Sequence, residues 1–126
     1  MEIISLSLDR KYVEDLDQIR ERHGFRSRSG LMRAAIDSLL NDYRILEEVK
    51  GHVDAVFTLT YHESRLGDLS SILARHQESI RTEIHQHHSG ICLRVLIVCA
   101  KAEEVRSFFS DLKSAKGVRS LQVSVL

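Results

Sequence analysis

Residues 80–99 have the sequence IRTEIHQHHSGICLRVLIVC, which decides the fold of the C-terminal part of the chain. Two runs in this stretch, 80–88 and 91–99, read as β-strands and are separated only by Ser89 and Gly90. A two-residue loop that contains glycine is typical of a β-hairpin. The stretch therefore predicts two neighbouring antiparallel strands.

The hairpin would bring three possible metal ligands to one face of the sheet. In this register His87 pairs with Cys92, and directly opposed residues share a face with Cβ atoms about 4.5–5.5 Å apart. His85 lies two residues before His87 and points to the same face. One histidine alone is usually a surface or core residue, but two imidazoles and a thiol together predict a metal site. Cys99 has the opposite parity and is expected on the other face, in the core.

The segments around the hairpin complete one small domain. Apolar residues alternate over 53–61, which predicts a strand, and recur at helical spacing over 66–80. A second helix is expected over 105–112 and a last strand over 121–125. The order β-α-β-β-α-β over 52–126 is that of a ferredoxin-like domain, in which both helices cover one face of an antiparallel sheet.

Residues 1–45 predict a second, smaller unit. Its first eight residues alternate like a short strand with one apolar face. Two helices follow, one over 10–23 and one that begins at a cap provided by Ser27 or Ser29. A single strand finds no partner in its own chain, so we expect two chains to pair their strands in an obligate dimer. Residues 44–52 are expected to be a linker.

The junction of the two N-terminal helices is basic, although Lys plus Arg equals Asp plus Glu at 18 each in the whole chain. One acid, Glu21, accompanies five arginines there. The arginines are Arg20, Arg22, Arg26, Arg28 and Arg33. Phosphates respond to local charge, because salt screens over about 10 Å. A two-stranded ribbon also fits the DNA major groove, where Ser5 and Ser7 would face the bases with Ile3 at the edge. A solvated basic turn is the alternative.

This unit resembles the ribbon-helix-helix family of DNA-binding repressors. The resemblance rests on the strand-helix-helix order and on Gly-Phe-Arg-Ser-Arg-Ser at 24–29, which runs into the second helix. In that family the Arg-Ser step and the helix start hold the phosphate backbone. The resemblance implies this role for Arg28 and Ser29, with Ser27 as the cap.

The whole chain resembles the nickel-responsive regulators of the NikR type, which join a ribbon-helix-helix domain to an ACT-like domain and assemble as tetramers. The resemblance is most specific in His-Gln-His at 85–87 and Cys-Leu-Arg-Val at 92–95, with a further match in Gly-Val-Arg at 117–119. It implies a nickel site that combines ligands of two chains. These ligands are His85, His87 and Cys92 of one chain and His76 of its neighbour.

Two ligand spacings are shorter here than is usual in that family. One residue fewer separates His87 from Cys92, which preserves the shared face, and two fewer separate His76 from His85. Two residues rotate a helical side chain by about 200°. The sequence pattern alone gives His76 a different role from that of a ligand. His76 falls on the apolar stripe of its predicted helix, and a histidine at such a position is usually a buried side chain with a hydrogen-bond partner. The donor set is compatible with nickel, zinc and copper.

The sequence thus predicts an α+β chain with a ribbon-helix-helix domain at 1–45 and a ferredoxin-like, ACT-like domain at 52–126. We expect a metal-responsive transcription regulator that binds double-stranded operator DNA as a homotetramer, a dimer of dimers, with one Ni²⁺ per chain. Alternatively, the ACT-like domain binds a small molecule or only oligomerises. An enzyme with Cys92 as nucleophile beside His87 is not expected, because no oxyanion hole is recognisable.

Composition agrees with a folded protein that acts inside the cell. Of 126 residues, 43% are hydrophobic and 29% charged. No run approaches the roughly 18 apolar residues of a membrane-spanning helix, and the first residues lack the pattern of a signal peptide. The two cysteines cannot form a disulfide framework. The expected location is therefore the reducing cytoplasm, without a membrane partner.

Overall fold

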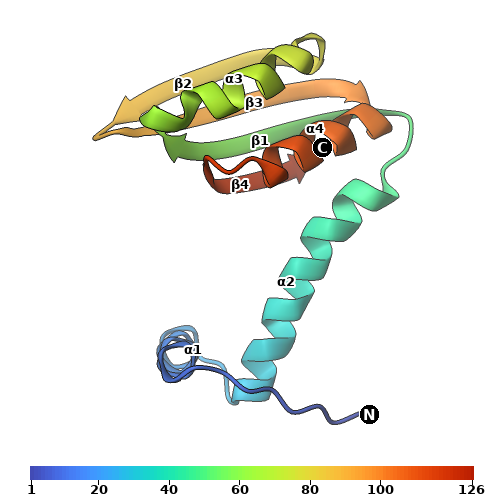
Figure 1. Cartoon of the computed structure of the whole chain (residues 1–126). Helices are drawn as coiled ribbons and strands as arrows, with labels where there is room; N and C mark the ends of the chain where they lie inside the picture. The colour runs from blue at the N-terminus through green and yellow to red at the C-terminus, as the bar shows by residue number, and fades with distance from the viewer. The chain divides into compact units, whose positions relative to one another are not determined.

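The computed structural model describes residues 1–126, which divide into two compact units, Met1–Asn41 and Asp42–Leu126 (Figure 1). None of its helices combines the length and the apolar character needed to cross a lipid bilayer.

The C-terminal unit has the predicted β-α-β-β-α-β order, with its two longer helices on one side of a four-stranded sheet (Figure 1). Its strands are β1 (His52–His62), β2 (Ile80–His88), β3 (Ile91–Lys101) and β4 (Val118–Val125). Its helices are α3 (Leu66–Arg75) and α4 (Ala102–Ser114), with short 3-10 turns at η1 (Glu63–Arg65) and η2 (Gln77–Ser79). The sheet order is β2-β3-β1-β4, and every neighbouring pair is antiparallel.

The alternation along β1 produces the core of this unit. Its odd-numbered residues from Val53 to Tyr61 are all buried, whereas the residues between them are half-buried or exposed. The ring of Phe57 packs against Phe108 of α4, with centroids 5.2 Å apart. Burying one large apolar side chain stabilises a fold by about 1.5–3 kcal/mol, so this face of the sheet provides much of the stability.

The opposite face of the sheet carries Cys99. It points away from Cys92, as predicted, but the expectation that Cys99 belongs to the core is wrong. Cys92 is the buried cysteine, at 3% exposure, and Cys99 is only half-buried. The reason is that the two helices cover the face with Cys92 and leave the other face open.

The N-terminal unit contains α1 (Arg10–His23) and the first part of α2 (Arg28–Glu48). Gly24 ends α1 with a φ of 72°, a conformation that glycine adopts without strain. Ser27 caps α2, because its Oγ accepts the backbone N–H of Gly30 at 3.0 Å. The single chain has no helix or strand at residues 1–9, so the N-terminal strand stays a prediction for the paired state.

Two predicted boundaries are wrong. Helix α2 continues to Glu48 through most of the expected linker at 44–52, because Leu46 packs into the core of the C-terminal unit. Arg106 of α4 also donates to the backbone carbonyl of Leu46, at 3.0 Å. Helix α3 ends at Arg75, because the chain turns through η2 before β2. His76 therefore follows the helix instead of lying within it.

Candidate functional site

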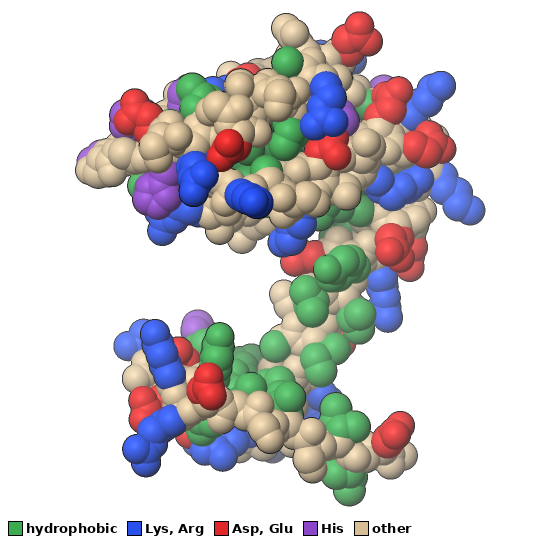
Figure 2. Space-filling model, viewed as in Figure 1, with side chains coloured by type: hydrophobic (Ala, Val, Ile, Leu, Met, Phe, Trp, Pro, Cys, Tyr) green, Lys and Arg blue, Asp and Glu red, His purple; other side chains and the backbone are tan.

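The β2–β3 hairpin has the predicted register. His87 lies opposite Cys92 and His88 opposite Ile91. The loop residues Ser89 and Gly90 both have positive φ, at 50° and 78°, as a tight two-residue hairpin turn requires. The register puts the strand positions of the predicted ligands on one face, and histidine side chains gather at this end of the sheet (Figure 2).

The side chains at these positions face different surroundings. Cys92 is buried opposite Tyr61 of β1, whereas His85 is exposed. The Nε2 atom of His87 lies 3.3 Å from a carboxylate oxygen of Glu63, the residue that follows β1. The backbone N–H of Glu63 also donates to the carbonyl of Gly90 at 2.9 Å. Within one chain, no three His, Cys, Asp or Glu side chains come close enough together to hold a metal ion.

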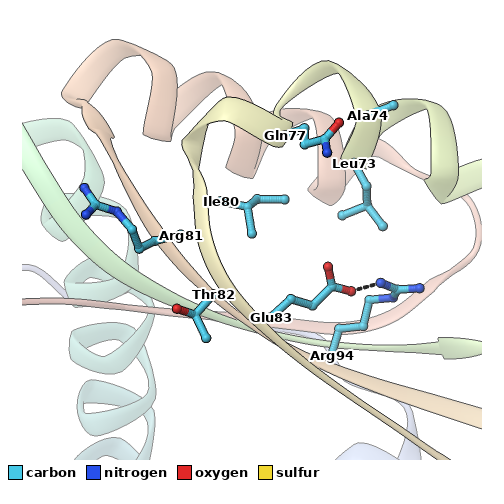
Figure 3. Close-up of a pocket in the computed structure, with 8 residues that line it drawn as sticks. All are labelled: Leu73, Ala74, Gln77, Ile80, Arg81, Thr82, Glu83 and Arg94. Carbon is cyan, nitrogen blue, oxygen red and sulfur yellow. Dashed lines mark ion pairs between the residues drawn. The ribbon is translucent and has the colours of Figure 1, made fainter.

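Arg94 is a charged residue beside this site that the sequence did not single out. It lies opposite His85 and is only 14% exposed. Its Nε donates to the hydroxyl of Tyr61 at 2.6 Å, and its guanidinium is paired with Glu83 of β2 (Figure 3). Arg94 and Glu83 line a cavity of about 400 Å³ under the end of α3. The sequence carries a signal that was missed: Arg94 lies two residues before the buried Leu96 in the same strand, so both side chains point to the same face.

His76 is a half-buried histidine with a hydrogen-bond partner in its own chain, close to what its place on the apolar stripe predicts. Its side chain is 13% exposed, and its Nε2 lies 2.7 Å from a carboxylate oxygen of Asp111 in α4. Because an ionised carboxylate only accepts, Nε2–H is the donor. The ring also stacks on Phe108, with centroids 4.5 Å apart and planes 10° from parallel. The fold of one chain does not bring His76 together with the hairpin histidines and Cys92.

The Cys99 thiol has a different environment from the candidate ligand Cys92. A hydrogen bond with the carboxylate of Asp54, its partner across the strands, raises the pKa of Cys99. A raised pKa disfavours the thiolate that binds metals. Cys99 is therefore a natural control for Cys92.

The predicted DNA-contacting side chains all belong to the N-terminal unit and are exposed. Ile3, Ser5 and Ser7 lie in the segment without regular structure, and Arg28 and Ser29 form the start of α2. Arg28 is also paired with Asp17 of α1, a contact that was not predicted from the sequence. This hydrogen bond lowers the pKa of Asp17 and raises that of Arg28. Nothing in the sequence pattern indicates this contact, since it joins two helices.

The chain matches two family models. Residues 2–43 match the ribbon-helix-helix protein, copG family, and residues 51–126 match the NikR C terminal nickel binding domain. The chain belongs to the NikR family. It is a nickel-responsive transcription regulator with an N-terminal DNA-binding domain, and it is not an enzyme.

Relatives match over nearly the whole chain. A protein of Pelobacter propionicus is 35% identical over 90% of this chain and 84% of its own length. A protein of Methanococcus maripaludis is 28% identical over 100% of this chain and 92% of its own length. Both carry the name "Putative nickel-responsive regulator". Among solved structures, an uncharacterized protein of Thermotoga maritima has a TM-score of 0.55 at 13% identity. It covers 60% of this chain and 98% of its own, and supports the fold alone.

Proposed function

We propose that this NikR-family chain binds one nickel ion through His85, His87 and Cys92, together with His76 of the partner subunit. The observation that carries this proposal is the register of the hairpin, in which His87 is directly opposite Cys92. His85 has the same parity as His87. Three nitrogens and one thiolate form a donor set that suits nickel, and planar coordination would distinguish Ni²⁺ or Cu²⁺ from zinc.

The surroundings of two histidines fit metal ligation. A histidine that binds a metal usually donates its other ring N–H to a carboxylate or carbonyl, which fixes the tautomer. Glu63 lies near Nε2 of His87, and Asp111 accepts from Nε2 of His76. When Nε2 of each histidine carries the proton, the lone pair lies on Nδ1, and this is the ring atom that would bind nickel. Nickel bound there would supply a positive charge and rigid links between strands and chains.

The N-terminal unit is proposed to hold double-stranded operator DNA as a dimer. Four apolar side chains, Ile3, Ile4, Leu6 and Leu8, are exposed in a segment that forms no strand in one chain. Pairing of this segment with its copy would bury part of this surface and present Ser5 and Ser7 to base edges. Arg28 and Ser29 would contact phosphates. Short hydroxyl side chains read bases weakly, so phosphate contacts would provide most of the affinity.

The two domains would act together in a homotetramer, a dimer of dimers in the cytoplasm. A metal ion shared between chains would favour one arrangement of the DNA-binding dimers. Nickel would then change the affinity for operator DNA by a certain factor, and operator DNA would change the affinity for nickel by the same factor.

Nickel titration of the metal-free protein tests the site. We expect one Ni²⁺ per chain, a thiolate charge-transfer band and a diamagnetic, planar centre. Cys92→Ala should abolish the band, and the matched control Cys99→Ala should leave it intact. His85→Ala and His87→Ala should each lower the affinity by about 10-fold or more. A band that survives in Cys92→Ala would contradict the assignment.

His76→Ala tests the contribution of the partner subunit separately. It should weaken nickel binding and also uncouple nickel from DNA affinity, because only this ligand would join two chains. If both the spectrum and the nickel-dependent DNA binding stay unchanged in His76→Ala, another group provides the fourth ligand.

The cavity beside Arg94 supports a second candidate function, in which the C-terminal domain binds a small organic ligand. Its volume of about 400 Å³ lies in the range of small-molecule sites. Metal-free protein with full DNA affinity would favour this alternative, and metal retained at one ion per chain would exclude it.

A further inference from the structure

Asp17 of α1 holds the guanidinium of Arg28 by two hydrogen bonds. Arg28 Nε donates to one carboxylate oxygen at 2.9 Å, and Nη2 donates to the other at 2.8 Å. The same carboxylate lies 3.8 Å from Nε of Arg20, three residues further along α1. Such a two-point contact fixes the plane and the direction of a guanidinium, whereas a single contact does not.

The pair leaves a part of Arg28 free for another anion. A guanidinium has five N–H groups, and Asp17 accepts from two of them. Three remain, two on Nη1 and one on Nη2. The Arg28 side chain is 65% exposed and that of Asp17 only 34%, so solvent reaches the arginine more easily than the carboxylate that holds it.

We propose that Asp17 is a positioning residue of the DNA interface, which orients Arg28 so that its free N–H groups meet a phosphate. This inference rests on the proposed phosphate contact of Arg28. Holding a long side chain in place before DNA arrives reduces the conformational entropy lost on binding. The opposing effect is repulsion between the Asp17 carboxylate and the phosphate. The high dielectric at an exposed site weakens that repulsion, and we expect the positioning effect to be the larger of the two.

The test compares two variants that remove the same charge from the same helix. Asp17→Asn removes the carboxylate that holds Arg28, whereas Asp15→Asn removes an exposed carboxylate that forms no ion pair. The full-length, nickel-loaded variants are titrated with a short mixed-sequence DNA duplex. General electrostatics predicts tighter binding for both. We expect Asp15→Asn to bind slightly tighter than wild type and Asp17→Asn to bind about two- to fivefold more weakly. Asp17→Asn that binds as tightly as Asp15→Asn, or tighter, would overturn the proposal.

A second variant tests the same contact without changing α1. Arg28→Lys keeps the positive charge but loses the two-point contact. It should weaken DNA binding about as much as Asp17→Asn, and wild-type affinity in Arg28→Lys would overturn the proposal. The Arg28 Nε–H resonance provides a spectroscopic readout, which should shift in Asp17→Asn and stay in place in Asp15→Asn.

Arg28→Ala separates a failure of this inference from a failure of the proposed function. If Arg28→Ala leaves DNA binding and its salt dependence unchanged, the phosphate contact itself is wrong. If Arg28→Ala weakens binding and Asp17→Asn does not, only the positioning role is wrong. In the Arg28→Ala background, Asp17→Asn should behave like Asp15→Asn, because the residue that Asp17 positions is gone.

Discussion

The C-terminal unit encloses its own core, and the N-terminal unit does not. Sixteen buried residues form one cluster in the C-terminal unit, whereas Leu31 is the only buried residue before residue 42. Apolar side chains instead lie on the surface of α2 and of the N-terminal segment (Figure 2). The C-terminal unit therefore buries enough apolar surface to fold as a single chain, whereas the N-terminal unit leaves apolar surface that the proposed dimer would cover.

Core truncation should have the largest effect on stability. Leu59 is fully buried in the C-terminal unit, and Ile97 on the open face of the sheet is 39% exposed. Leu59→Ala should lower the free energy of unfolding by about 2–5 kcal/mol. Ile97→Ala, which removes as many carbon atoms, should cost clearly less. Chemical denaturation followed by circular dichroism measures both. An equal loss at Ile97 would mean that the open face is covered in the assembled protein.

Substitution of Gly117 tests how tightly the C-terminal unit is packed at the loop before β4. A Cβ at this position would lie 2.6 Å from Cβ of Arg65, closer than such atoms approach. We expect Gly117→Ala to cost about 1–3 kcal/mol in the free energy of unfolding. Gly67 in α3 is the matched control, because a Cβ there meets nothing within 4 Å. Gly67→Ala should be neutral or stabilising by up to about 1 kcal/mol. Similar losses in both variants would contradict the packing argument.

The fold of the C-terminal unit could be predicted because its signals are local. The alternation in β1 and the two-residue loop specified strands, faces and register. His76 was misplaced because helical spacing continues through a 3-10 turn, which the apolar pattern does not reveal. The contacts Asp17–Arg28 and His76–Asp111 could not be predicted, since each joins two elements whose packing the local pattern does not specify. The hairpin register does place Glu83 diagonally across from Arg94, so that pair was within reach of the sequence and was missed. The N-terminal strand stays a prediction, because one chain cannot form its pairing.

The cap of α2 should have a smaller effect, confined to the N-terminal unit. Ser27→Ala removes the acceptor for the backbone N–H of Gly30 and should cost about 1 kcal/mol. Ser29→Ala, two residues on, lacks this role and should change stability little. Hydrogen exchange of the α2 amides near residue 30 reports the local loss. Protection that stays unchanged in Ser27→Ala would show that another group caps the helix.

The ion pair of Asp17 should give the smallest effect, visible only in acid. Its pKa is lowered from the ordinary 3.8, mainly by the hydrogen bond from Arg28. The stability that the carboxylate contributes is therefore present above about pH 4 and is lost as the pH falls through the lowered pKa. Thermal unfolding between neutral and acidic pH should depend less on pH in Asp17→Asn than in Asp15→Asn. An identical pH dependence in the two variants would contradict the ion pair in solution.

Operator DNA affinity with and without nickel tests whether the C-terminal site controls the DNA-binding domain. The nickel affinity is measured with and without DNA in the same series. A duplex selected from a random pool by the nickel-loaded protein serves as the probe. We expect nickel to change the DNA affinity by at least about fivefold, and DNA to change the nickel affinity by the same factor. Equal DNA affinity in the metal-free and nickel-loaded protein would contradict the claim that the C-terminal site controls the DNA-binding domain.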